Sequence, residues 1–443
     1  MFQVLRNAWK ITELRKKILF TALILLVFRI GSAITVPFVD TAVLAEGMTS
    51  ADAGFMGYLT MMSGGGFSNA SIFALSITPY INASIILQLL TVAIPYLENL
   101  SKEGEAGRKK LGQFTRYGTV ILGLLLGIGY YFMVRNQYGA LVSYAKSGFN
   151  AWFAAIVIVL CFVAGSSLIM WLGEQINEHG IGNGISMLLF AGILSRLPYG
   201  GRILWEYFYN MGLDPVLQGQ SEGIWNVLLA VAVLILFLAM IGFIVFMSDA
   251  ERRIPVQYAK KVVGRKMYGG QNTHIPIKVN MSGVMPIILA VSILSLPSII
   301  RTFFGEPSGF FKNVLDLFSQ DSWIYIVLYA LMIVGFSFFY VTIQYNPVEM
   351  ANNLRKNGGA IPGQRPGKPT ADFIKRVLNK VTFIGALFLG VVALFPSVFG
   401  KLTGFTSLTI GGTSLMIVVG VALETVQQIE SQMMMRHYKG FLD

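Results

Sequence analysis

Charged residues are scarce in this chain: lysine, arginine, aspartate and glutamate make up 13% of its 443 residues. Soluble domains typically hold about a quarter. Between Arg29 and Lys102 there is no lysine or arginine at all. Long apolar stretches of this kind are typical of membrane spans, which need roughly 20 apolar residues to cross the hydrocarbon core as a helix. The composition therefore predicts a chain that crosses a membrane several times.

Cysteine and histidine are scarce as well, which limits the available chemistry. The single cysteine, Cys161, can form neither an internal disulfide nor a cysteine metal cluster. The three histidines, His179, His274 and His437, are too scattered for a metal site. There is no Walker-type phosphate loop, and the glycines of 180–184 open an apolar stretch, which favours a tight turn. We therefore expect no metal, no cofactor and no enzymatic activity.

Ten apolar stretches are candidate spans. They lie at 17–36, 75–96, 115–134, 151–173, 181–198, 224–247, 283–303, 322–343, 380–399 and 406–426. Five precede the polar loop 199–223 and five follow it, so the two halves enter the membrane from opposite sides, as inverted repeats do. We predict an all-α polytopic membrane protein with ten transmembrane helices. Its two pseudo-symmetric halves, 1–198 and 224–443, are joined by 199–223 as an external hinge loop.

The basic residues predict the orientation. With the N-terminus inside, the inner segments hold 26 of the 34 lysines and arginines, as the positive-inside rule expects. Two of these inner segments, 248–282 and 344–379, are long and basic, and their turn residues indicate ordered, protruding loops. Both termini are expected in the cytoplasm. This placement argues against a simple nucleic-acid-binding role for the net charge of +12.

Ionisable groups are missing from the centres of the second to tenth spans, and Arg29 lies inside the first. An ion-coupled transporter normally needs buried carboxylates or histidines. An intramembrane protease needs a nucleophile with a base, or paired carboxylates. Arg29 itself is expected to bind a carbonyl or to snorkel. The chain is thus predicted to be a passage or a scaffold, and a partner would supply the energy for transport.

Two features favour a gated passage. The segment 55–70 is moderately apolar, too short to span, and flexible at Gly64–Gly66. A short re-entrant helix fits it, because such backbone is tolerated at membrane depth only inside protein or a cavity; an outer interfacial loop is the alternative. Ile77 and Ile81 share one helix face. A ring of such side chains would stop ions by dewetting, although ordinary span packing gives the same spacing.

A third feature is the mild polarity of two spans, which carry Thr78, Asn82, Ser84 and Gln88 in the second and Asn280, Ser282 and Ser292 around the seventh. Hydrogen bonds between such groups across helices are worth about 1 kcal/mol or less. Weak contacts of this size suit an interface that must open, and static packing explains them equally well.

Five motifs resemble the bacterial SecY family. They are SIFALSITPYI at 71–81, WLGEQINEHGIGNGIS at 171–186, QNTHIPIKVN at 271–280, PGQRPG at 362–367 and GGTSLMI at 411–417. The resemblance implies two halves of five spans around an hourglass pore in the plasma membrane of a bacterium. Such a channel passes unfolded secretory polypeptides outward and releases apolar helices sideways into lipid.

The resemblance also implies partners. SecE would brace the back of the channel, SecG would be an accessory, and the ATPase SecA or the ribosome would dock in turn and drive transport. Signal peptides, nascent polypeptides and membrane lipids would pass or surround the channel, and YidC and SecDF are further partners that it allows. The inner loop 172–182 has no lysine or arginine, so no docking role is expected for it.

Roles for individual residues follow from the resemblance alone. The pore ring would be Ile77, Ile81, Leu189, Ile288 and Ile417, where Leu189 departs from isoleucine but has similar bulk. The plug, a short re-entrant helix at about 55–70, would include Met61, Met62, Ser63, Gly64, Gly65, Gly66 and Phe67. The lateral gate, between the second and the seventh to eighth spans, would include Asn82, Gln88, Asn280 and Leu296. Docking of SecA or the ribosome would use Arg252, Arg253, Arg265, Lys266 and Arg365.

Two other classes of protein stay open from the residues alone. A small-solute transporter built from inverted repeats would need a midplane site of ionisable groups or half-helix ends, and the spans lack the ionisable groups. A membrane assembly scaffold would need no pore at all. Contact between a passing chain and the predicted ring residues would separate it from a channel.

Overall fold

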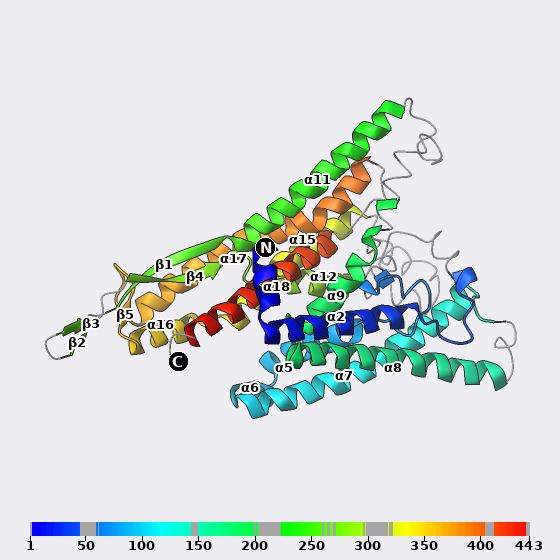
Figure 1. Cartoon of the computed structure of the whole chain (residues 1–443), viewed down its shortest axis with the longest axis horizontal. Helices are drawn as coiled ribbons and strands as arrows, with labels where there is room; N and C mark the ends of the chain where they lie inside the picture. Colours follow the sequence, from blue (N-terminus) through cyan, green and yellow to red (C-terminus); the bar gives the residue numbers. More distant parts are fainter. Residues whose placement is uncertain are drawn as a thin grey trace.

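The chain folds mostly into helices (Figure 1). The computed structural model describes residues 2–44, 59–60, 62–142, 149–198, 201–202, 223–258, 261–263, 266–268, 272–295, 297, 318, 322–403 and 412–439. Most of the predicted hinge loop 199–223 lies outside these residues.

Each predicted span overlaps a helix. In chain order these are α2 (Thr12–Ala33), α5 (Thr78–Ala93), α7 (Glu105–Phe132), α8 (Phe149–His179), α9 (Gly184–Leu194), α11 (Gly223–Asp249), α12 (Met285–Leu294), α15 (Trp323–Gln344), α17 (Lys368–Thr403) and α18 (Gly412–Lys439). Among the described residues, four helical stretches are long and apolar enough to cross a membrane, and a bent pair adds a fifth. The class of fold is therefore as predicted, and the helices are consistent with ten spans.

Helix ends differ from the predicted ones where proline or charge was misjudged. The second span breaks after Ala93, and α6 (Pro95–Lys102) leaves α5 at an angle of 103°. Pro95 has no amide hydrogen and begins the new helix, which explains the break. At the other extreme, α17 begins at Lys368 instead of 380 and α18 continues to Lys439 instead of ending at 426. Polar turns thus extend two apolar helices beyond their spans.

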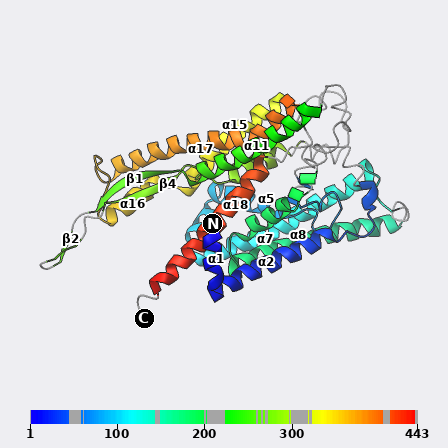
Figure 2. The ribbon, with the colours of Figure 1, turned by 45° about the horizontal axis from the view of Figure 1, so that its top comes forward.

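The helices form two groups with α18 between them (Figures 1 and 2). Helices α2, α5, α7 and α8 lie together, as do α11, α12, α15 and α17, and α9 and α18 contact each other at the boundary. The short helix α1 (Phe2–Lys10) contacts both α2 and α18. Both termini lie near the same end of α18 (Figure 2).

Each group has its own apolar core, and a further cluster joins the two. This central cluster contains side chains from both groups: Ile24, Phe28, Met62, Phe73, Ile77, Ile81, Ile85, Ile169, Leu172, Ile176, Leu188, Leu189, Ile193, Ile288, Leu289, Ile417 and Val421. Aliphatic residues dominate it, so the groups meet through non-directional contacts.

The two basic inner loops are not purely irregular, which is a departure from an all-helical fold. Strand β1 (Glu251–Tyr258) pairs antiparallel with β4 (Asn272–Lys278), with Pro255 opposite His274. The same strand pairs with β5 (Gly359–Ala360) from the second loop, so the sheet order is β4-β1-β5. Strands β2 (Lys261–Val263) and β3 (Lys266–Tyr268) pair further out, and α16 (Pro347–Lys356) precedes β5.

Large apolar side chains cover the outward faces of the bundle. Trp152 is 75% exposed, Phe246 72%, Ile121 66% and Val327 66%. Monomeric soluble proteins rarely expose extended apolar surface, so this face needs a cover. The lipid of a membrane supplies such a cover, in agreement with the predicted class of protein.

Gly165 in α8 should be intolerant of a side chain. A Cβ atom there would lie 2.0 Å from the carbonyl oxygen of Ile72, whereas a Cβ at Gly112 in α7 would meet nothing within 4 Å. Gly165→Ala is expected to cost about 1–3 kcal/mol because backbone must move, and to lower the thermal unfolding temperature of the purified protein in detergent. Gly112→Ala is the matched control. Equal unfolding temperatures for the two variants would contradict this close approach.

Candidate functional site

The five predicted ring residues meet in the central cluster. Ile77 immediately precedes α5, and the others lie on α5, α9, α12 and α18. All five are buried, with Ile288 the most exposed at 8%. They therefore come from both groups of helices, although they are far apart in the sequence. The grouping is an observation, and the role of a ring is considered below.

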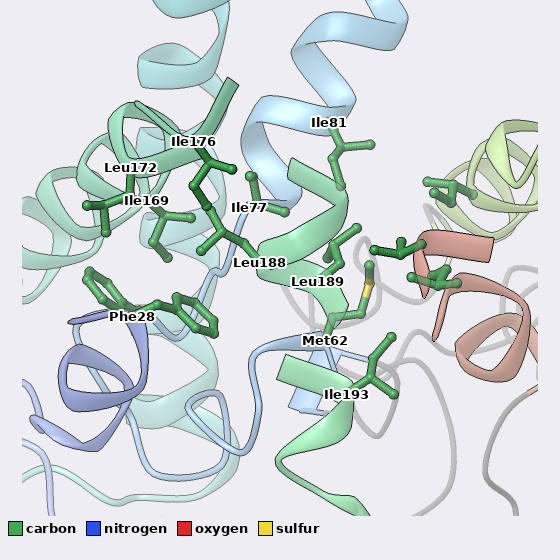
Figure 3. Packing of buried hydrophobic residues seen from close by; sticks show 14 of the residues in the cluster. Phe28, Met62, Ile77, Ile81, Ile169, Leu172, Ile176, Leu188, Leu189 and Ile193 are labelled. Carbon is green, nitrogen blue, oxygen red and sulfur yellow. The ribbon is translucent and has the colours of Figure 1, made fainter. Parts of the chain in front are cut away.

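Residues 62–70 cover this cluster. Met62 is part of it, and Figure 3 shows Met62, Ile81 and Leu189 pointing toward the same space. The segment lies against the backbone of α9, because a Cβ atom at Gly192 would be 2.4 Å from the Met62 carbonyl oxygen. Met61 lies outside the described residues, as do 55–58.

The predicted re-entrant helix is not regular where it is described. From Ser63 to Ala70 the chain forms consecutive turns. Gly64 and Gly65 have φ values of 64° and 92°, a left-handed conformation that glycine adopts without steric cost. The glycines that suggested flexibility therefore shape a tight turn.

Polar contacts hold this segment in place from three sides. Arg29 Nη1 donates to the Gly64 carbonyl at 2.9 Å, which confirms the predicted carbonyl partner. Tyr130 Oη donates to the Phe67 carbonyl at 2.6 Å, and Ser76 Oγ donates to the Met62 carbonyl at 3.2 Å. Because the carbonyls belong to a turn, side chains satisfy acceptors that a helix would pair internally.

The predicted gate residues lie where α5 meets α12 and α15. Ser292 Oγ donates to Asn82 Oδ1 at 3.3 Å, and Tyr340 Oη donates to Gln88 Oε1 at 2.8 Å. Asn280 does not join these pairs; its Oδ1 atom is buried without a hydrogen-bond partner among the described residues. Leu296 lies outside those residues. Two neutral hydrogen bonds are thus the polar contacts observed at this seam.

The docking candidates lie on the shared sheet and on the loop that follows it. Arg252 and Arg253 are exposed on β1, and Arg253 Nε donates to Glu251. Arg365 is exposed beyond β5, and its carbonyl accepts from Thr370 Oγ1 at 2.8 Å. Lys266 lies in β3, and Arg265 is outside the described residues. The β1–β5 pairing brings the two loops together.

Some contacts had no clear signal in the sequence. Tyr340 is one of several hydroxyl residues on the apolar helix α15, so nothing singled it out as the partner of Gln88. Arg116 on α7 and Glu174 on α8 form a two-point ion pair, with Nε–Oε1 and Nη2–Oε2 distances of 2.9 Å. Both lie at span ends, where opposite charges could have been paired by their shared depth.

A model of the SecY family matches residues 71–426. The chain belongs to this family. Curated relatives include the protein translocase subunit SecY of Halalkalibacterium halodurans, 43% identical over 445 residues, and that of Streptomyces coelicolor, 44% identical over 456 residues. In both comparisons each chain is covered completely. The recognition of the family from its motifs is confirmed.

Solved structures of similar fold come from more distant proteins. One is described as a protein-conducting channel, with a TM-score of 0.60, 19% identity, and coverage of 94% of this chain and 92% of that one. Another is Sec61 in the canine ribosome–channel complex, with a TM-score of 0.57, 16% identity and the same coverage. At this identity the likeness establishes the shared fold.

Removing the Arg29 contact should loosen residues 62–70. Arg29→Gln loses the guanidinium bond to Gly64, and a loss of about 1 kcal/mol would raise labelling of the exposed residue 69 (Asn69→Cys) about fivefold. The measurement is the rate of thiol labelling in a Cys161→Ser background. Arg135→Gln is the control, because Arg135 binds Tyr131 instead. Identical rates in the two variants would contradict the anchoring role.

Proposed function

We propose that this chain is the channel-forming subunit of a bacterial protein translocase. It passes unfolded secretory polypeptides across the plasma membrane and releases membrane-protein helices sideways into lipid. The observation that carries the proposal is the convergence of five aliphatic side chains, from both groups of helices, on one buried cluster. The names of the curated relatives support it.

The central cluster acts as the constriction of the channel. Aliphatic walls disfavour water and hydrated ions when the space between them is narrow. They also hold each other through dispersion and the hydrophobic effect without directional bonds, so a polypeptide can replace one set of apolar contacts with another. Ile77, Ile81, Leu189, Ile288 and Ile417 form the ring that closes around it.

Residues 55–70 act as the plug beneath this ring. Met62 contributes to the apolar seal, and the turn 63–70 is held by the side chains of Arg29, Ser76 and Tyr130. Each neutral hydrogen bond of this type contributes on the order of 1 kcal/mol. A set of such contacts keeps the plug in place at rest and still lets it leave when a chain enters.

The seam between α5 and helices α12 and α15 acts as the lateral gate. Its polar contacts are Asn82–Ser292 and Gln88–Tyr340, which are neutral and weak in a membrane bundle. Opening the seam therefore costs little beyond apolar contacts that lipid or an apolar passenger helix can replace. In this proposal the segments 1–198 and 224–443 are the two sides, joined by 199–223.

The basic loops form the docking surface for the driving partner. The sequence holds no phosphate loop, so SecA or the ribosome supplies the energy, while SecE and SecG stabilise the channel. Arg252, Arg253 and Arg365 are exposed near the β4-β1-β5 sheet, and Arg265 and Lys266 extend the same loop. The positive-inside rule places this surface and both termini in the cytoplasm. The chain itself performs no catalysis.

Enlarging the ring is expected to make the channel leak. Replacing both Ile77 and Ile81 with glycine removes aliphatic bulk from the constriction, so the conductance of small ions through reconstituted protein should rise several-fold. Ile121→Gly on the outward face of α7 is the control, since Ile121 is 66% exposed. An assembled double variant with unchanged conductance would refute the assignment of the ring.

Reversing the charge of Arg365 is expected to stop SecA-driven export and to leave the bundle folded. The exposed guanidinium would become a carboxylate, and attraction to an acidic partner surface would turn into repulsion. The measurement is export of a precursor into vesicles, with detergent-extracted protein checked by size exclusion. Arg355→Glu, in the exposed part of α16, is the matched control. Normal export by the Arg365→Glu channel would exclude the docking role.

A further inference from the structure

A polar pocket lies at the boundary between the two groups of helices. It has a volume of about 380 Å³ and is lined by Asn177, Gly182, Asn183, Glu424 and Gln428. The first three come from the end of α8 and the turn before α9, whereas Glu424 and Gln428 come from α18. A pocket of this volume is large enough for a small ligand or a long side chain.

The pocket adjoins the central cluster. Glu424 follows the cluster residue Ile417 by seven positions on α18, so the two share a helix face and lie about 10 Å apart along the axis. On the opposite wall, Asn177 directly follows Ile176, which is also in the cluster. A group bound in the pocket would therefore sit about two helical turns from the ring.

The turn that forms one wall is held in a fixed shape. Asn177 Oδ1 accepts from the Gly184 amide at 2.7 Å, and Gln428 Oε1 accepts from the Gly182 amide at 2.6 Å. Asn183 caps α9 through the amides of Ile185 and Ser186. The second of these contacts joins the two groups of helices. The pocket is thus built before any ligand arrives.

The chemistry of the lining favours a cation. Glu424 brings a carboxylate, and the side-chain amide oxygens of Asn177, Asn183 and Gln428 each retain one lone pair besides the bond described. In the described part of the chain Glu424 forms no salt bridge, and the nearest strand presents Lys278, whose Nζ donates to Gln427 at 3.1 Å. Ammonium and guanidinium groups carry several donors and form their strongest hydrogen bonds with carboxylates.

A cation in the pocket has a natural source if the chain is a protein channel, and the inference rests on that proposed function. Secretory polypeptides begin with a positively charged region followed by an apolar stretch of about 7–15 residues. The surrounding inner loops are strongly basic and repel such a start. A carboxylate beside the ring provides a local site of opposite sign.

We propose that the pocket at Glu424 binds a lysine or arginine side chain at the start of a passenger polypeptide. Bound there, the cation places the apolar stretch that follows it next to the central cluster. The pocket bridges both groups of helices, through the Gly182–Gln428 contact, so an arriving cation competes for groups that hold the boundary together. Glu424 thereby couples recognition of the passenger to separation of the groups.

The test compares two precursors that differ only at their start, one with lysine or arginine and one with glutamine at the same positions. Export into vesicles is measured for the wild-type channel and for Glu424→Gln, with Glu430→Gln as a control on the same helix outside the pocket. We expect the wild-type and control channels to prefer the basic precursor about fivefold, the scale of an exposed ion pair. Glu424→Gln should lose this preference and export both precursors at the lower rate.

Charge reversal provides a second variant. Glu424→Lys should prefer a precursor whose start carries glutamate, which a purely structural role of Glu424 would not produce. An unchanged preference in Glu424→Gln, or an equal loss of both precursors, would overturn the inference. Absence of export of either precursor by the wild-type channel would instead reject the proposed function. Size exclusion shows whether each variant is folded, and a photo-reactive label at Gln428→Cys tests the contact in a channel that keeps Glu424.

Discussion

The apolar contact between the two groups of helices is the constraint on which the rest of the structure depends. Ile81 on α5 and Leu189 on α9 meet Ile288 on α12 and Ile417 on α18 in one cluster. Contacts of this type are strong in sum but have no fixed partners. The cluster can therefore seal the boundary at rest and still exchange its contacts with an apolar guest.

The polar contacts around the cluster are suited to the same requirement. Neutral pairs hold the seam at Gln88 and Asn82, while the ion pair of Arg116 and Glu174 joins two helices within one group. Strong electrostatic contacts across a boundary would resist opening, because separated charges in a membrane are costly. The described part of the structure thus uses its two-point ion pair within a group and weak bonds between groups.

Much of the fold was accessible from the sequence, because hydropathy alone marks helices such as α8 and α15. The family, and with it the ring residues, came from motifs; the spacing of Ile77 and Ile81 could not be told from ordinary packing. The pairing of β1 with β5 was beyond local reasoning, since register across about one hundred residues depends on the tertiary fold. The bend at Pro95 carried a readable signal, whereas the turns of 63–70 depend on partners such as Arg29 and Tyr130.

The boundary between the groups gives the account its central claim: a passing polypeptide touches the central cluster. The direct measurement is crosslinking of a stalled secretory chain to single cysteines at Ile288 and Ile417 in a Cys161→Ser background. Trp152→Cys, on the outward face and 75% exposed, is the control. The account predicts crosslinks from both cluster positions and none from the control. Crosslinks absent from both cluster positions, with export intact, would contradict it and favour a scaffold that transports nothing through its centre.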